Sequence, residues 1–303
     1  MSEVDQAPGW LRRSDARQAF VVTLCSTADL DVAVAALQAE ITELVLLEPA
    51  SLRGNACELV IECLPAEAWS LLQSLRGLPA ADVYLQPRDR QPMRVLICDM
   101  DMTIVAAETL DEVAAELGLG ERIAEITRRA MHGEVDFNSA LRERIAMLRG
   151  QPEQVFHDIV DKLELNPGAE ALLAAAGDAG VHSVLISGGF AQVAEPVARR
   201  LGFDEVVCNQ LEVEDGQLTG AVIDPIVNAD YKLSVLQRVA RDRGCTLDQC
   251  CAIGDGANDL PMVRAAGLGI AYYGKPVLRA ASDCCIDSTD LASVVHFMRL
   301  ARD

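Results

Sequence analysis

The segment MRVLICDMDMT, residues 93–103, indicates the fold of most of this chain. Its apolar run, residues 95–98, is typical of a buried strand in a parallel sheet. The run stops at two acids, Asp99 and Asp101. In an open α/β sheet, ligands bind in the crevice at the carboxyl ends of the strands. The segment therefore predicts a ligand site here, unless the two acids are only the polar end of the strand.

Composition and charge disfavour several classes of protein. The chain has 303 residues, of which 50% are hydrophobic, and a formal net charge of −20. This acidity argues against binding to nucleic acid or to an anionic membrane. No apolar run approaches the roughly 20 residues of a membrane span, and the first ten residues do not read as a secretory signal. We therefore expect a two-domain cytoplasmic protein.

The ten cysteines and four histidines show no metal-type spacing. None of the cysteines forms a C-x-x-C pair, and the histidines do not cluster. Several cysteines lie in apolar runs, where free cysteine behaves as a small hydrophobic residue. The pattern disfavours a zinc site and a disulfide framework.

Residues 1–88 are expected to form an α+β domain. Residues 1 to about 18 are polar and irregular, which predicts a mobile leader. The apolar pattern that follows has the order βαββαβ, which is the ferredoxin-like arrangement. Strands are expected at FVVTLC (20–25), ITELVLL (41–47), CELVIECL (57–64) and ADVYLQP (81–87), with helices at 31–38 and 65–75.

This order resembles the ACT-like regulatory domains that precede some amino-acid enzymes. The resemblance is one of architecture, because the sequence has no glycine-rich ligand loop of the kind that such domains use. A structural or dimerising role and amino-acid sensing both stay open. The resemblance is compatible with a homodimer.

Residues 89–303 are expected to form an α/β domain with a doubly wound parallel sheet. The charged segment RDRQP, residues 88–92, reads as the linker. An insert of helices at about 108–165 follows the first strand and is expected to cap the site. The alternation of strands and helices then resumes, with a hairpin turn at Glu214-Asp215-Gly216. In the insert, helices are expected at 108–117, 121–132, 137–148 and 152–163.

Four groups of polar residues fall at or near predicted strand ends. Each alone has an ordinary explanation: a polar strand end, a turn, or a solvated lysine at the start of a helix. In chain order the groups are Asp99, Asp101 and Thr103; Ser187 and Gly188; Lys232; and Asp255, Asn258 and Asp259. Together they resemble the four motifs of the haloacid dehalogenase superfamily of phosphotransferases, from Arg94 onward.

Phosphoryl transfer explains why such a site needs these groups. An aspartate carboxylate can attack a phosphoryl group and divide its hydrolysis into two displacements, so Asp99 is the candidate nucleophile. Asp101 can protonate the leaving oxygen and then take a proton from the attacking water. A cation must offset the charge of the phosphate, and Mg²⁺ suits such a site. The resemblance implies that the Asp99 carboxylate, the Asp101 backbone carbonyl and the Asp255 carboxylate are the Mg²⁺ ligands.

The same resemblance gives roles to the other motif residues. The Lys232 ammonium and the Ser187 hydroxyl would hold the transferring phosphoryl group, and Gly188 would let the backbone come close to it. Asn258 would lie on the substrate side, and with Asp259 it would orient the metal shell and Lys232. Thr103 would support the first loop.

The insert resembles that of the phosphoserine phosphatases, whose pattern runs along residues 95–260. Glu108 and Arg144 read on their own as surface helix charges, but they match the residues that take the ammonium and the carboxylate of the substrate. A guanidinium group is well shaped for a carboxylate. Met131 and Phe137 match residues on the apolar side of the substrate. Two positions depart from the family pattern, Met102 where a small residue is usual and His132 where Asn, Arg or Gln is common.

The leading interpretation is a Mg²⁺-dependent enzyme that hydrolyses O-phospho-L-serine to L-serine and phosphate, the last step of L-serine biosynthesis. A second interpretation keeps the chemistry with another phospho-amino acid, or with an amino alcohol as substrate or acceptor. A third is a non-catalytic amino-acid sensor. The complete set of acids disfavours the third interpretation.

Overall fold

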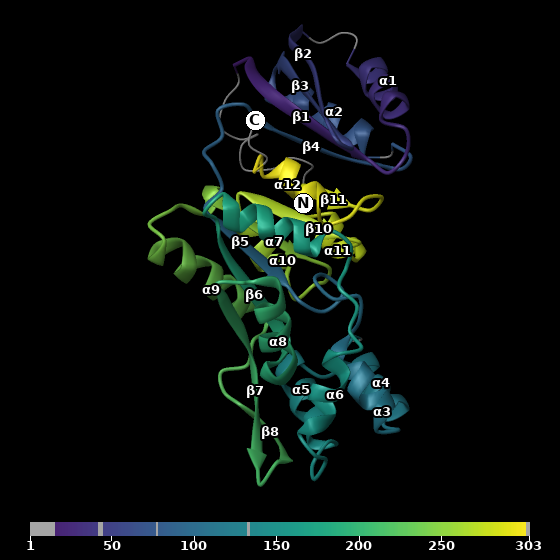
Figure 1. Ribbon diagram of the computed structural model, residues 1–303, viewed down its shortest axis with the longest axis vertical. Helices are drawn as coiled ribbons and strands as arrows, with labels where there is room; N and C mark the ends of the chain where they lie inside the picture. Colours follow the sequence, from purple (N-terminus) through teal and green to yellow (C-terminus); the bar gives the residue numbers. More distant parts are fainter. Residues whose placement is uncertain (1–15, 42–44, 77, 132–133, 301–303) are drawn as a thin grey trace.

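The computed structural model describes residues 16–41, 45–76, 78–131 and 134–300. Most of the predicted leader, residues 1–15, and His132 lie outside the described residues. Figure 1 shows three parts along the long axis: an N-terminal sheet with its helices, a larger sheet below it, and a group of helices beside a long hairpin at the bottom. None of the helices in the described ranges is long and apolar enough to cross a membrane.

The N-terminal sheet has the predicted ferredoxin-like arrangement. Its strands run antiparallel in the order β2-β3-β1-β4, and the chain order is βαββαβ. The inward residues of the sheet and the two helices form one apolar core. The elements are β1 (Gln18–Ser26), α1 (Leu30–Glu40), β2 (Val45–Arg53), β3 (Ala56–Cys63), α2 (Pro65–Leu75) and β4 (Ala81–Pro87).

The predicted bounds of the second strand, 41–47, are wrong. Ile41 is the C-cap of α1, residues 42–44 lie outside the described residues, and β2 covers Val45–Arg53, six residues beyond the predicted end. The strand continues past Pro49, which cannot donate a hydrogen bond to a sheet. Within the described residues β2 pairs only with β3, and a proline is tolerated on an edge strand.

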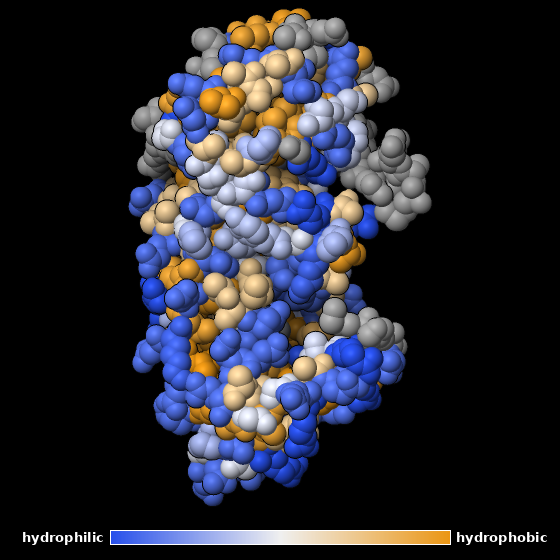
Figure 2. All heavy atoms as spheres, turned by 90° about the vertical axis from the view of Figure 1, so that its right-hand side faces the viewer, coloured by the Kyte–Doolittle hydropathy of each residue, from blue (hydrophilic) through white to orange (hydrophobic). Residues whose placement is uncertain are grey.

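Edge strand β2 and neighbouring α1 carry much of the exposed apolar surface of the described residues. Val32, Val45, Leu46 and Leu52 are each at least half exposed. Figure 2 shows hydrophobic surface at the top of the molecule, over the N-terminal sheet, and further hydrophobic patches lower on the same face, among hydrophilic surface. Apolar edge strands of this kind favour association with other chains.

The second sheet is the predicted doubly wound one. Its order is β11-β10-β9-β5-β6-β7-β8, and all neighbours are parallel except β7 and β8. The last two form the predicted hairpin, in which Asp215 and Gly216 take positive φ angles. The strands are β5 (Val95–Asp99), β6 (His182–Phe190), β7 (Glu205–Glu214), β8 (Gln217–Ile223), β9 (Cys250–Gly254), β10 (Leu268–Tyr272) and β11 (Cys284–Ile286).

Helices cover both faces of this sheet, as alternate residues of β5 show. Leu96 and Cys98 belong to the core formed with α7, α8 and α12, whereas Val95 and Ile97 belong to the core formed with α9, α10 and α11. A strand buried on both sides reads as a continuous apolar run. The elements are α7 (Ala169–Asp178), α8 (Ala191–Leu201), α9 (Ala229–Asp242), the 3₁₀ helix η3 (Leu247–Gln249), α10 (Leu260–Ala265), α11 (Pro276–Arg279) and α12 (Ser293–Phe297).

The predicted helical insert lies between β5 and β6 in the chain. Hairpin β7–β8 is tied to it, because the Gly150 N–H donates to the Leu218 carbonyl at 2.8 Å and the Leu218 N–H donates to that of Gln151 at 2.9 Å. Insert and hairpin therefore form one unit at the carboxyl end of the sheet (Figure 1). The helices are α3 (Thr109–Glu116), α4 (Gly120–Met131), α5 (Phe137–Ala146) and α6 (Gln154–Val160).

A buried carboxylate joins the N-terminal sheet to the larger one. Asp82 on β4 is 5% exposed. Its oxygens accept hydrogen bonds from the backbone N–H groups of residues 287–289, at 2.8–3.2 Å, and from the Thr289 hydroxyl at 2.6 Å. Tyr84 also stacks edge-on against Phe297 of α12. The segment after β11 is thus held from the N-terminal side.

Candidate active site

Asp99 lies at the carboxyl end of β5, where a lysine from α9 reaches it. Lys232 Nζ is 2.6 Å from Asp99 Oδ1 and 2.7 Å from Asp259 Oδ1. The Asn228 side chain caps α9 by accepting from the Tyr231 N–H at 3.0 Å. This start of the helix sets Lys232 on the same buried face as Val235 and Leu236, toward the sheet.

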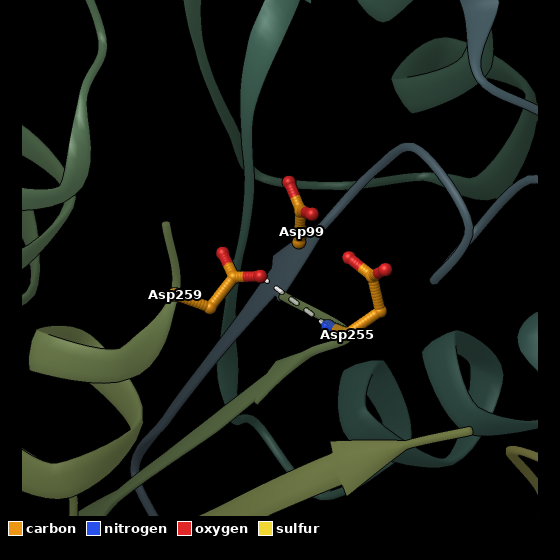
Figure 3. A group of neighbouring side chains, drawn as sticks. All are labelled: Asp99, Asp255 and Asp259. Atoms are coloured by element: carbon orange, nitrogen blue, oxygen red, sulfur yellow. Dashed lines mark hydrogen bonds between the residues drawn. The ribbon is translucent and has the colours of Figure 1, made fainter. Parts of the chain in front are cut away.

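Asp259 is fixed by the loop that follows β9. Its Oδ2 accepts from the Asp255 N–H at 3.3 Å and from the Gly256 N–H at 3.2 Å, and the first of these bonds is drawn in Figure 3. A Cβ at Gly254 would lie 2.4 Å from Asp259 Cγ. Only glycine at position 254 lets Asp259 come this close to the strand.

Asp99, Lys232 and Asp259 form a buried cluster in which the pKa values of Asp99 and Lys232 are both raised. Burial and the neighbouring Asp259 carboxylate raise the pKa of Asp99 well above its usual range, against the opposing effect of Lys232. Burial lowers the pKa of Lys232, but the two carboxylates outweigh it and raise that pKa. When all three groups are ionised, two acids with one cation leave net negative charge in the buried site, and a further cation would offset it.

Carboxylate oxygens of Asp99, Asp255 and Asp259, one from each, lie within 4.8 Å of one another. Figure 3 shows Asp99 and Asp255 pointing the same way, with the Asp259 side chain reaching toward them from the left. Both oxygens of Asp259 accept hydrogen bonds, whereas Asp99 Oδ2 and Asp255 Oδ1 have no such bond within the described part of the chain. Two free carboxylate oxygens, with room for water ligands, fit the preference of Mg²⁺ for oxygen.

Asp101 faces the helical insert. Its Oδ1 accepts from the N–H of Thr109, the first residue of α3, at 2.9 Å, and its Oδ2 accepts from the Ser187 hydroxyl at 3.2 Å. Burial raises the pKa of Asp101, although both hydrogen bonds oppose the shift. A raised pKa suits a carboxyl group that must give and take a proton.

A pocket opens between the sheet and the insert, and it brings together predicted residues from both. It is lined by Asp99, Asp101, Glu108, Thr109, Leu110, Phe137, Leu141, Arg144, Gly188, Gly189, Phe190, Asp255, Asn258 and Lys275. Seven of the predicted site residues thus share one pocket with the candidate nucleophile.

Arg144 and Glu108, the two residues predicted to bind the charged groups of the substrate, differ in their surroundings. Arg144 is largely buried, and its Nε lacks a hydrogen-bond partner within the described residues. Burial lowers the pKa of Arg144, with Asp111 and Glu108 opposing. Glu108 keeps contact with solvent at the pocket mouth, yet burial and the Asp101 carboxylate raise its pKa to about 7. A largely buried guanidinium group whose Nε has no partner among the described residues is suited to take an anion.

Gly188 lies under the Phe137 ring. A Cβ at position 188 would meet the ring at 3.6 Å and the Val227 carbonyl oxygen at 3.6 Å, which are ordinary contacts. Packing within the protein therefore does not require glycine at this position. The free space beside it leaves room for a ligand near the backbone.

Other predicted residues lie outside the pocket lining. Ser187 and Lys232 are fully buried behind it. The Ser187 hydroxyl donates to Asp101 and accepts from the Gly189 N–H at 2.8 Å. Met131 ends α4, and its side chain, like all of His132, is outside what the structure describes. Met102 has a positive φ of 57° and is 40% exposed.

Lys275 is a pocket residue that the sequence analysis missed. Its Nζ lies 3.1 Å from Asp255 Oδ2, and its backbone N–H donates to the Asp255 carbonyl oxygen at 2.7 Å. Lys275 is the N-cap residue of α11, just after β10. A lysine between the end of a strand and a proline was the only sequence signal available.

Comparisons with known proteins by family, by sequence and by structure agree with one another. The family model for haloacid dehalogenase-like hydrolases matches residues 96–264. A phosphoserine phosphatase of Streptococcus thermophilus is 42% identical over 204 residues, which cover 67% of this chain and 95% of that protein. The crystal structure of a HAD family hydrolase from Salmonella enterica serovar Typhi has a TM-score of 0.84 at 30% identity, covering 92% of this chain and 98% of that one. A substrate-bound phosphoserine phosphatase has a TM-score of 0.64 at 33% identity, covering 68% and 99%.

Proposed function

The chain belongs to the phosphoserine phosphatases of the haloacid dehalogenase-like hydrolase family, and on that premise we propose that it hydrolyses O-phospho-L-serine through an aspartyl phosphate on Asp99. One observation carries the proposal. The same pocket is lined by Asp99 and Asp101 and by the opposite charges of Glu108 and Arg144. A zwitterionic phosphoester needs both sets of groups.

Asp99 is the nucleophile of the proposed reaction. Its Oδ1 is held by Lys232, so the carboxylate keeps one orientation and Oδ2 stays open. Attack of a carboxylate oxygen on phosphorus forms the acyl phosphate and breaks the bond to the serine oxygen. Lys232 balances the charge of the acid before the attack and that of the phosphoryl group after it.

Asp101 is the proton donor and acceptor. Its raised pKa favours the protonated form that the leaving serine oxygen requires. Once it has lost that proton, the carboxylate can take one from the water that hydrolyses the aspartyl phosphate. The bonds from Thr109 and Ser187 hold the carboxyl group in one place through both steps.

The carboxylates of Asp99 and Asp255, with the backbone carbonyl of Asp101, would hold Mg²⁺. When bound, the metal would supply positive charge that lets a carboxylate approach a phosphate. Asp259 keeps the Asp255 loop in place through the backbone N–H groups of residues 255 and 256. The predicted roles of Ser187, Gly188 and Asn258 near the phosphoryl group are part of the same proposal.

Substrate selection is assigned to the insert. Arg144 would bind the carboxylate of phosphoserine and Glu108 its ammonium group, while Phe137 and Met131 would cover its apolar side.

We place the protein in the cytoplasm at the last step of L-serine biosynthesis. We also propose the division into an ACT-like domain, 1–88, and a phosphatase domain, 89–303, with the cap inserted at about 108–165. The apolar edge at β2 supports a homodimer.

The test is phosphate release from a panel of esters, with Mg²⁺ and with EDTA. The panel contains L- and D-phosphoserine, phosphothreonine, phosphoethanolamine and a sugar phosphate. The proposal expects turnover of L-phosphoserine well above that of phosphoethanolamine, and loss of turnover in EDTA. Equal turnover of phosphoethanolamine would mean that the carboxylate is not recognised, and no turnover of any ester would favour an amino-acid sensor.

A further inference from the structure

The two lysines at the site are held very differently. The Lys232 side chain is 1% exposed and lies between two carboxylates. The Lys275 side chain is 55% exposed, and Asp255 is its one carboxylate partner within the described residues. A lysine side chain with a flexible stem and an exposed ammonium group can leave its partner at little cost.

The backbone of Lys275 is fixed, whereas its side chain is largely exposed. Its N–H donates to the Asp255 carbonyl oxygen at 2.7 Å, and Pro276 at the start of α11 restricts the residue before it to an extended conformation. The hydroxyl of neighbouring Tyr273 donates to the Thr289 carbonyl at 3.0 Å. Lys275 therefore stays beside Asp255 even when its ammonium group moves away.

Asp255 is also where a divalent cation would bind. Its Oδ2 carries the Lys275 ammonium, and Figure 3 shows its carboxylate beside that of Asp99. A metal ion on this carboxylate must either displace the ammonium group or bind beside a like charge. Both alternatives lower the affinity of the site for the metal.

We propose that Lys275 competes with Mg²⁺ for the Asp255 carboxylate and thereby sets the metal affinity of the site. The inference rests on the proposed metal site of Asp99 and Asp255. In the metal-free protein the ammonium group partly neutralises the acidic cluster, and metal binding releases it into the pocket. Lys275 is thus a positioning residue for Asp255 that acts against the metal.

An ordinary orienting role for Lys275 would have the opposite effect. Outer partners that hold a metal ligand in place usually strengthen binding, and their removal weakens metal affinity by about 10–100-fold. Competition predicts tighter binding after removal. The sign of the change therefore separates the two roles.

The experiment is calorimetric titration of Mg²⁺ into the full-length protein without substrate, at one fixed pH. Lys275→Met should bind Mg²⁺ at least about fivefold more tightly than the wild type, because a like charge beside the metal is removed. Lys275→Arg should remain close to the wild type. Lys162→Met, which removes an exposed lysine paired with Glu116, controls for the change in net charge.

A second measurement compares the melting temperature of each protein with and without Mg²⁺. The rise in melting temperature caused by saturating Mg²⁺ should be larger for Lys275→Met than for the wild type, because tighter binding stabilises more. If the Lys275→Met variant does not fold, Lys275→Gln is used in its place for both measurements. Unchanged or weaker Mg²⁺ binding by the Lys275 variant would overturn the inference about Lys275 but not the proposed metal site. Absence of Mg²⁺ binding by the wild type would overturn the proposed metal site as well.

Discussion

Lys232 Nζ lies 2.6 Å from Asp99 Oδ1, and both side chains are at most 4% exposed. The reactive carboxylate is thus paired with a cation inside the protein, away from bulk water. Burying such an ion pair costs free energy. Removing one partner costs more, because the other charge is then buried without compensation. Function and stability are therefore coupled at this point of the fold.

Replacing Lys232 with methionine should destabilise the protein strongly. The change leaves Asp99 and Asp259 buried without their cation, so we expect the free energy of unfolding at pH 7 to fall by about 3–5 kcal/mol. Urea denaturation measures it. Lys162→Met is the matched control, because the Lys162 pair with Glu116 is exposed and should contribute less than about 1 kcal/mol. Equal effects of the two variants would contradict the account.

Arg144→Gln should affect phosphoserine and spare phosphoethanolamine. The buried guanidinium group is assigned to the substrate carboxylate, so kcat/KM for phosphoserine should fall by an amount equivalent to about 2–4 kcal/mol. Phosphoethanolamine has no carboxylate, and its kcat/KM should hardly change. Arg142→Gln, on the same helix but paired with Asp224, is the control. A parallel loss with both esters would contradict the assignment.

Binding of L-serine should weaken at low pH because of Glu108. Its pKa is raised to about 7 by burial and by Asp101, so the carboxylate that attracts an ammonium group is present above that pH and is lost as pH falls through it. Calorimetry of L-serine with the metal-free protein should show a dissociation constant that rises from about pH 8 to about pH 6. Serine has no phosphate to titrate in this range. Glu108→Gln should remove the pH dependence, and its persistence would exclude Glu108 as the cause.

Asp82→Ala should loosen the junction between the two sheets. The change removes the acceptor for three successive backbone N–H groups, residues 287–289, and for the Thr289 hydroxyl. We expect a loss of about 2–4 kcal/mol in the free energy of unfolding. Thermal denaturation measures it, with Glu40→Ala at the exposed end of α1 as control. A loss no greater than that of the control would contradict the proposed importance of this junction.

The main features of the fold could be predicted because local patterns agree with the tertiary structure. The apolar run 95–98 is buried on both sides, and Asp99 follows at its carboxyl end, as predicted. Asp255 then lies beside Asp99 because β9 is the parallel neighbour of β5. The bounds of β2 could not be predicted, since tolerance of Pro49 depends on that strand lying at the edge.

The site was harder to predict where it depends on tertiary contacts. Lys275 is a single lysine with no characteristic spacing, and only the parallel sheet brings it to Asp255. The Ser187 hydroxyl, which is proposed to act near the phosphoryl group, contacts Asp101 and Gly189 in the structure, and the sequence did not indicate these contacts. Such second contacts arise from neighbouring strands, and no local pattern encodes them.

Trapping of the covalent intermediate tests the central claim most directly. The Mg²⁺-loaded protein would be mixed with L-phosphoserine, quenched in acid within a single turnover, digested and analysed by mass spectrometry. The account predicts a phosphoryl group on the peptide that contains Asp99, and none in the Asp99→Asn variant or after phosphoethanolamine at the same concentration and time. Turnover of phosphoserine without a phosphorylated Asp99 peptide, or with the group on another residue, would contradict it.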